Sequence, residues 1–262
     1  MIYRTHQNVM LPSLGFGTWK LKGEVARESV RDAIVAGYRH VDTARAYGNE
    51  EEVGRGIAES GVDRDDVFVA SKLGPDSFTP ERVKTETENS LRALQTSYLD
   101  LLLIDWPTED IPVAETLGAM SELAAEGKIK HIGVRKYTVA QLREANLYAP
   151  IFTDQIEYHP YIDHRELLAF ARDENVLVTA CSPLAGGRVF ADPEIRTIAE
   201  RNGMTSAQVA LRWLVQQQNV VTLTRSENPE HRREDFAIFD FDLTPQEMAT
   251  INALSSPAAA TL

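Results

Sequence analysis

The sequence predicts a parallel (β/α)8 TIM barrel with an N-terminal β-hairpin and extra C-terminal helices, and three observations support this prediction. Short apolar segments and amphipathic segments alternate about eight times along the 262 residues, as parallel strands joined by helices do. No G-x-G-x-x-G turn follows the first strand, which disfavours an open doubly wound sheet. No linker or low-complexity segment interrupts the alternation, so residues 1–262 are expected to form one barrel domain.

The first half of the chain supplies the hairpin and the first strand–helix units. The hairpin is expected within residues 2–12, and strands are expected at 14–19, 40–43, 67–73 and 99–105. Helices are expected at 23–38, 51–60, 80–94 and 112–127. The first of these helices has an apolar face formed by Ala26, Val30, Ala33 and Ile34. Thr79 and Pro80 suit the N-cap and the first helical position of the third helix.

The second half of the chain repeats the pattern. Strands are expected at 129–135, 152–160, 176–183 and 220–226, and helices at 138–149, 164–175, 192–203, 205–218, 229–236 and 244–254. The strand at 99–105 is typical of one covered on both faces, because four bulky aliphatic residues, 101–104, follow one another. It ends in Asp105, and a buried strand that delivers a carboxylate needs an explanation.

Composition excludes several classes of function. Acidic residues outnumber basic ones by 39 to 27, which disfavours nucleic acid as a partner because phosphates need a basic surface. No apolar run approaches the ~20 residues of a membrane span, and no export signal is visible. The single cysteine, Cys181, cannot form an intramolecular disulfide. A single thiol fits a reducing cytoplasm, and a cytoplasmic location is expected. A monomer is also expected, and the histidines show no recognised metal-ligand motif.

The C-terminal ends of the strands are the expected site of chemistry in a TIM barrel. The strands that end in Asp42 and Lys72 are neighbours by topology, so an ion pair is expected. Tyr47 follows five residues after Asp42, and a cation lowers the pKa of a phenol from ~10. The three residues therefore form a plausible proton-donor relay. A lysine in this position is also compatible with Schiff-base chemistry, which remains an alternative.

Four segments resemble the aldo-keto reductases, of the bacterial and archaeal type that includes 2,5-diketo-D-gluconate reductases. They are GYRHVDTARAYGNEEEVG, VFVASKL, DLLLIDWP and DQIEYHPY, and the resemblance extends over about residues 14–254. It implies that a nicotinamide cofactor lies across the barrel mouth and passes hydride to a carbonyl. It also implies that Tyr47 donates the proton, that Lys72 lowers its pKa, and that Asp42 orients Lys72 and touches the nicotinamide ribose.

The resemblance implies further contacts. Gln155 would hold the nicotinamide carboxamide, and Trp19 and Trp106 would form the walls of the substrate pocket. The other positions that it assigns to the cofactor are Arg135, Asp154, Cys181, Ser182, Leu184, Arg225, Ser226, His231 and Asp235. NADP(H) is favoured because Arg225 and His231 can bind a 2′-phosphate. Glu227 and Asp235 oppose a phosphate and keep NAD(H) open.

The sequence departs from the family pattern at this site. Arg135 and Lys136 stand where the family usually has Ser-Asn, Asp154 where it has Asn, and Cys181 where it has a stacking tyrosine. At the adenosine end, His231 stands for arginine and Asp235 for asparagine. Cys181 removes a stacking contact worth ~1 kcal/mol.

Asp105, in place of the family histidine, is the largest departure. An ionised carboxylate only accepts hydrogen bonds and repels a developing alkoxide. Asp105 either pairs with Lys72 or Arg135 and stays ionised, or is protonated by burial and donates. The predicted function is NAD(P)H-dependent reduction of small aldehydes or ketones. The alternatives are an impaired relative that binds a metabolite or a partner, and a reductase of activated carbon–carbon double bonds.

Overall fold

The computed structural model describes residues 2–257 and contains a closed barrel of eight parallel strands, in the order β10-β11-β3-β4-β5-β6-β7-β8. The barrel strands are β3 (Leu14–Gly17), β4 (His40–Asp42), β5 (Phe68–Leu73), β6 (Leu99–Asp105), β7 (Ile129–Arg135), β8 (Ile151–Glu157), β10 (Leu177–Cys181) and β11 (Val220–Thr224). The predicted fold class is therefore confirmed.

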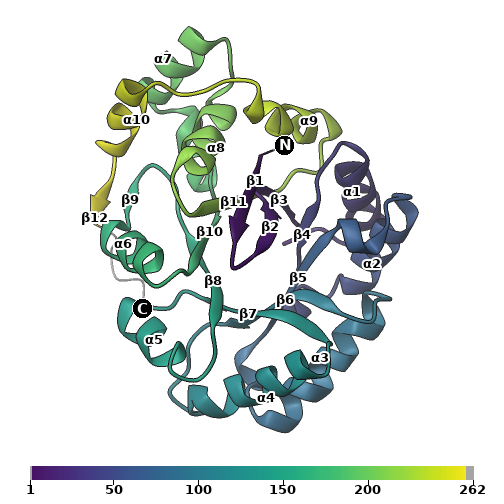
Figure 1. Cartoon of the computed structure of the whole chain (residues 1–262). Helices are drawn as coiled ribbons and strands as arrows, with labels where there is room; N and C mark the ends of the chain where they lie inside the picture. Colours follow the sequence, from purple (N-terminus) through teal and green to yellow (C-terminus); the bar gives the residue numbers. More distant parts are fainter. Residues whose placement is uncertain (1, 258–262) are drawn as a thin grey trace.

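Helices surround the ring of strands (Figure 1). They are α1 (Gly23–Val35), α2 (Glu50–Glu59), α3 (Pro80–Ala93), α4 (Val113–Ala125), α5 (Val139–Ala145), α6 (Arg165–Asp173), α7 (Pro193–Asn202), α8 (Ser206–Gln216), α9 (Pro229–Phe236) and α10 (Pro245–Asn252). Short 3-10 turns lie between them: η1 (Arg45–Tyr47), η2 (Arg64–Asp66), η3 (Pro75–Ser77), η4 (Ala185–Phe190) and η5 (Ala237–Phe239).

The predicted hairpin forms strands β1 (Tyr3–His6) and β2 (Val9–Pro12), which lie across one end of the barrel (Figure 1). Leu11 of the hairpin is buried against residues inside the barrel. This inner cluster also contains Phe68, Ala70, Leu101, Leu103, Phe152, Leu177 and Val221. The hairpin thus covers the N-terminal end of the barrel, which leaves the opposite end open for a site.

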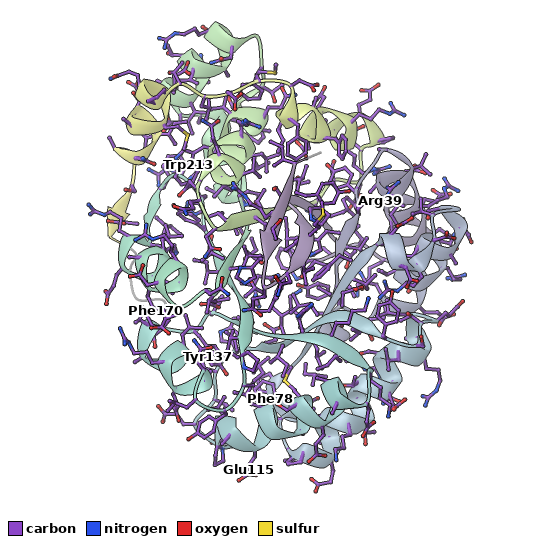
Figure 2. All side chains as sticks on the ribbon, viewed as in Figure 1. Arg39, Phe78, Glu115, Tyr137, Phe170 and Trp213 are labelled. Atoms are coloured by element: carbon purple, nitrogen blue, oxygen red, sulfur yellow. The ribbon has the colours of Figure 1, made fainter. Side chains whose placement is uncertain are left out.

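A second and larger apolar layer lies between the strands and the helices. Phe78, Tyr137, Phe170 and Trp213 belong to this layer, and Figure 2 shows them on the helical side of the ring. Strand β6 therefore has apolar partners on both of its faces, as its uninterrupted run of aliphatic residues predicted.

Most predicted elements are confirmed, with small changes at their ends. The bounds of β6, β7 and α9 match the prediction, whereas α5 ends at Ala145 rather than at residue 149. Thr79 occupies the N-cap of α3, but its side chain makes no capping hydrogen bond. The short pair of β9 (Ile162–Asp163) and β12 (Ser256–Pro257) was not predicted. The last five residues of the predicted domain lie outside the described residues.

Within residues 2–257, no helix combines the length and the apolar character needed to cross a membrane.

Candidate active site

The predicted ion pair forms at the mouth of the barrel, between the neighbouring strands β4 and β5. Lys72 Nζ donates to Asp42 Oδ1 at 2.5 Å and to the Thr43 carbonyl oxygen at 2.8 Å. Both residues of the pair are buried. Burial has the largest single effect on the pKa of Lys72 and lowers it, but Asp42 and Tyr47 raise it, and the net shift is upward. Lys72 therefore stays protonated.

Tyr47 ends the turn η1 that follows β4, and Lys72 Nζ lies 5.2 Å from the centroid of its ring. Gly48 comes next with φ of 59°, a left-handed conformation that favours glycine. Burial has the largest effect on the pKa of Tyr47 and raises it, whereas Lys72 and Arg135 lower it. The expected lowering by Lys72 is present, but it does not outweigh burial in the protein alone.

Asn49 fixes the loops that carry Tyr47 and Trp19. Its Nδ2 donates to the carbonyl oxygens of Thr18 at 2.9 Å and Leu21 at 3.0 Å, and its Oδ1 accepts from Thr43 at 2.9 Å. This residue was not among the predicted site residues. Its place in the YGNE motif, directly after the left-handed Gly48, was the available signal.

A bulge between β7 and β8 decides which residue of β8 faces into the barrel. Ile132 pairs with Ile151 but Gly133 pairs with Thr153, so β8 contains one extra residue at Phe152. Arg135 therefore pairs with Gln155 rather than with Asp154. A shift of one residue reverses the faces of a strand, so Gln155 points inward. Its Nε2 donates to Asp42 Oδ2 at 2.9 Å.

Asp154 lies on the other face of β8 and does not join the residues at the mouth. It is fully buried, and its Oδ1 accepts from the Tyr137 backbone N–H at 3.4 Å. Burial raises its pKa well above the ordinary value. The structure thus places Asp154 between β8 and the start of α5. There it accepts a hydrogen bond from the backbone, on the face of β8 opposite to Gln155.

Asp105 and Arg135 are register partners at the ends of β6 and β7. Arg135 Nη1 donates to Asp105 Oδ1 at 2.6 Å. Of the two possible partners that the sequence left open for Asp105, Lys72 and Arg135, the structure therefore shows Arg135. Arg135 Nε is also buried and has no hydrogen-bond partner among the described residues.

Two tryptophans border the same mouth, and both are exposed. The Trp106 ring has the Arg135 guanidinium at 4.7 Å and Lys136 Nζ at 4.1 Å from its centroid. The Trp19 ring has Lys20 Nζ at 4.2 Å. Trp106 and Lys136 both have a positive φ, 76° and 59°, which is uncommon for side chains of this size. The chain thus turns sharply directly after each member of the Asp105–Arg135 pair.

Cys181 ends β10 and is partly buried. Burial raises the pKa of its thiol, although nearby Arg135 and Lys72 oppose this shift. Ser182 follows with φ of 54° and is exposed, and Leu184 packs partly against the outer apolar layer. Of these three residues, Cys181 is the one on which Arg135 acts electrostatically.

The residues predicted for the adenosine end gather at the loop between β11 and α9. Arg225 lies 3.7 Å from Glu227, and Ser226 Oγ lies 3.4 Å from His231 Nδ1. Asp235 is buried and accepts from Thr224 Oγ1 at 2.6 Å. Burial raises the pKa of Asp235 to about 6.

Arg232 organises this loop, although it was not among the predicted site residues. It is buried and donates to the carbonyl oxygens of Ser226 at 3.0 Å and Glu227 at 2.9 Å. It also forms an ion pair with Asp32 of α1 at 3.2 Å. The only signal in the sequence was an arginine at a position where α9 should face the core.

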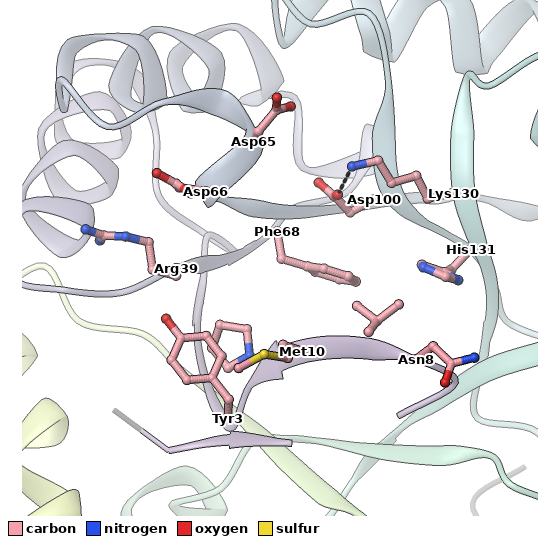
Figure 3. Close-up of a pocket in the computed structure, with 12 residues that line it drawn as sticks. Tyr3, Asn8, Met10, Arg39, Asp65, Asp66, Phe68, Asp100, Lys130 and His131 are labelled. Atoms are coloured by element: carbon pink, nitrogen blue, oxygen red, sulfur yellow. Dashed lines mark hydrogen bonds and ion pairs between the residues drawn. The ribbon is translucent and has the colours of Figure 1, made fainter. Parts of the chain in front are cut away.

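A cavity of about 300 Å³ lies at the opposite end of the barrel, under the hairpin (Figure 3). Tyr3, Met10, Phe68 and His131 line it, together with charged residues (Figure 3). Among these, Asp100 is already paired with Lys130 at 3.0 Å. None of the predicted site residues lines this cavity.

The model of the aldo/keto reductase family matches residues 13–256. The chain belongs to this family. A glyoxal reductase of Bacillus subtilis (strain 168) is 39% identical over 255 residues, which cover 96% of this chain and 92% of that protein. A 9,11-endoperoxide prostaglandin H2 reductase of Trypanosoma cruzi (strain CL Brener) is 36% identical over 256 residues, which cover 95% of this chain and 90% of that protein.

Solved structures agree. A structure described as a candidate 2,5-diketo-D-gluconic acid reductase B is 43% identical, with a TM-score of 0.95, and the match covers 98% of this chain and 92% of that chain. This aldo-keto reductase is therefore an oxidoreductase, and its relatives support carbonyl reduction as the general reaction. Members of the family use nicotinamide cofactors and act on small carbonyl compounds.

Proposed function

We propose that this aldo-keto reductase reduces small aldehydes and ketones with NAD(P)H, with Tyr47 as the proton donor. The observation that carries the proposal is the buried Asp42–Lys72 pair beside the Tyr47 ring. The lysine cation stabilises a phenolate at Tyr47 after the proton has left. Asp42 holds that cation in place, and Gln155 holds Asp42 from the other side of the barrel.

The residues at the mouth fit the nicotinamide end of the cofactor. Gln155 and Asp42 provide amide and carboxylate groups for a carboxamide and a ribose hydroxyl, and the buried Arg135 Nε is a donor without a partner among the described residues. A carboxamide oxygen is a suitable acceptor for that donor. When bound, the nicotinamide supplies the hydride. Cys181 adds a small polarisable contact in place of an aromatic ring.

We favour NADP(H) over NAD(H), because Arg225, Ser226 and His231 lie together where β11 leads into α9. An arginine and a hydroxyl suit a 2′-phosphate. Glu227 competes for Arg225, and Asp235 adds a second carboxyl group nearby. The preference is therefore expected to be small.

The proposal is tested with purified protein, with glyoxal and 4-nitrobenzaldehyde as probes. Titration with NADPH and NADH, followed by nicotinamide fluorescence, measures cofactor binding before any turnover is assayed. Tyr47→Phe should retain cofactor binding within about threefold and lose carbonyl reduction by at least about 100-fold, the usual contribution of a general acid. Retained turnover would refute the role of Tyr47. An absence of cofactor binding would instead favour a non-catalytic relative that binds a metabolite or a partner.

A further inference from the structure

We propose that Arg135 is the cationic donor that polarises the substrate carbonyl, and that Asp105 is the residue that positions it. This inference rests on the proposed function. It assigns the donor to the substrate carbonyl oxygen, a role that Asp105 in place of the family histidine does not fill. Carbonyl reduction puts negative charge on an oxygen, and a fixed donor aimed at that oxygen is often the largest electrostatic contribution to catalysis.

Asp105 cannot supply that donor in this structure. Its side chain accepts a hydrogen bond from Arg135 Nη1 at 2.6 Å, and a carboxylate paired with a guanidinium in this way acts as an acceptor only. Asp105 alone would repel the developing alkoxide. Paired with a guanidinium, its charge is compensated, and the donors at this position of the mouth belong to Arg135.

The guanidinium is held in one place by contacts from two directions. Asp105 binds it from β6, and the Trp106 ring lies 4.7 Å from it. A cation over an indole face is attracted by the ring electrons. The arginine side chain is only 17% exposed, so surrounding residues restrict its movement more than they would restrict a surface arginine. Preorganisation of this kind is what distinguishes an effective electrostatic donor from a mobile surface charge.

Arg135 also has donors to spare. A guanidinium carries five N–H groups, and the bond to Asp105 is the one hydrogen bond that it makes within residues 2–257. Its Nε is buried without a partner among these residues. One side chain can therefore donate from Nε to a carboxamide oxygen and from its terminal nitrogens to a carbonyl oxygen.

The electrostatic coupling to Tyr47 supports the same placement. Arg135 lowers the pKa of Tyr47, as Lys72 does, while Asp42 and Asp105 raise it. The guanidinium is thus close enough to the phenol to influence its proton. The carbonyl oxygen takes its proton from Tyr47 after hydride addition at carbon, and Arg135 keeps all its protons and stabilises the charge in between.

Arg135→Ala is the test, with Lys20→Gln as the matched control. Lys20 is another cation at the mouth that lies over a tryptophan, but it makes no contact with Asp105. With saturating NADPH and 4-nitrobenzaldehyde, Arg135→Ala should lower kcat by about 100-fold or more. Guanidinium chloride at about 10 mM, far below the molar range that unfolds proteins, should restore part of this rate. Lys20→Gln should stay within about threefold and show no response to guanidinium.

Two readouts are independent of turnover. The Kd for NADPH of Arg135→Ala should change much less than kcat does. The ionisation of Tyr47 is followed by the ultraviolet absorbance of its phenolate in cofactor-free protein. The spectrum of the matching Tyr47→Phe variant is subtracted to isolate this signal. The phenolate signal should appear at higher pH in Arg135→Ala than in the wild type. Circular dichroism confirms that each variant is folded. If Arg135→Ala does not fold, Arg135→Lys replaces it: this variant keeps the charge but loses the fork of donors, and should lower kcat by at least about tenfold.

The proposal is overturned if a folded Arg135 variant keeps kcat within about threefold of the wild type, or if its whole loss lies in cofactor affinity. For Arg135→Ala, a loss that guanidinium does not restore, without a shift in Tyr47 ionisation, would also overturn it, since that result indicates a merely structural role. A separate outcome concerns the proposed function: if Tyr47→Phe is fully active, the relay itself is wrong, whatever Arg135 does.

Discussion

Asp42 and Gln155 meet across the barrel: Gln155 Nε2 of β8 donates to Asp42 Oδ2 of β4 at 2.9 Å. Their strands are four apart in either direction around the closed ring, so the two side chains come from opposite walls. Asp42 also accepts from Lys72 through its other oxygen at 2.5 Å. Both oxygens of one buried carboxylate are thereby satisfied, which fixes the relay before any ligand binds.

Removal of Lys72 should be costly for stability as well as for activity. Lys72→Met leaves Asp42 buried without its counter-charge, which destabilises proteins by about 3–5 kcal/mol. The double variant Asp42→Asn with Lys72→Met removes both charges and should recover a large part of that loss. Guanidinium chloride unfolding followed by circular dichroism measures both. Equal destabilisation of the two variants would contradict the idea that the unpaired charge is the cause.

Asp235→Asn should stabilise the protein in a pH-dependent way. Burial raises the pKa of Asp235 from 3.8 to about 6. The folded chain therefore binds this proton more tightly than the unfolded chain does, and the wild type loses stability as pH rises between about 4 and 6. Asparagine keeps an acceptor for Thr224 without a charge.

The expected gain in the free energy of unfolding is up to about 3 kcal/mol at pH 8, since each pKa unit corresponds to ~1.4 kcal/mol, and it should disappear near pH 4. Urea unfolding at a series of pH values measures it. Asp240→Asn, an exposed acid in the same part of the chain, is the control and should show no such dependence. A gain that is constant with pH would show that the charge of Asp235 is not responsible.

Glu227→Gln should shift cofactor preference toward NADPH. Glu227 lies 3.7 Å from Arg225, and the two side chains are 60% and 38% exposed. Exposed pairs contribute at most about 1 kcal/mol, so the Kd for NADPH should fall by about two- to fivefold, with that for NADH nearly unchanged. Fluorescence titration measures both constants. The effect should diminish at 1 M salt, which screens exposed charges. A change in Kd that salt does not reduce, or one that is equal for NADPH and NADH, would argue against a phosphate contact at Arg225.

Much of this fold could be predicted from local patterns. The apolar run of β6 and the amphipathic pattern of α1 reflect which surfaces are buried, and burial is written into the sequence at a period of two or 3.6 residues. The limits of α5 were harder to predict, because residues 146–149 continue a helical pattern that the chain does not follow. The role of Asn49 was equally hidden, since its partners, Thr18 and Leu21, are remote in the sequence.

The sequence by itself determined the strand order that brings Asp42 beside Lys72, because adjacent β–α units place adjacent strand ends together. Only the tertiary structure decided which cation Asp105 meets and which residue of β8 faces the mouth. The physical reason is register: a single bulge at Phe152 turns Gln155 inward and Asp154 outward, and the pairing of β6 with β7 sets Arg135 opposite Asp105. A one-residue shift changes no hydrophobic pattern that a sequence displays, yet it changes which side chains the site contains.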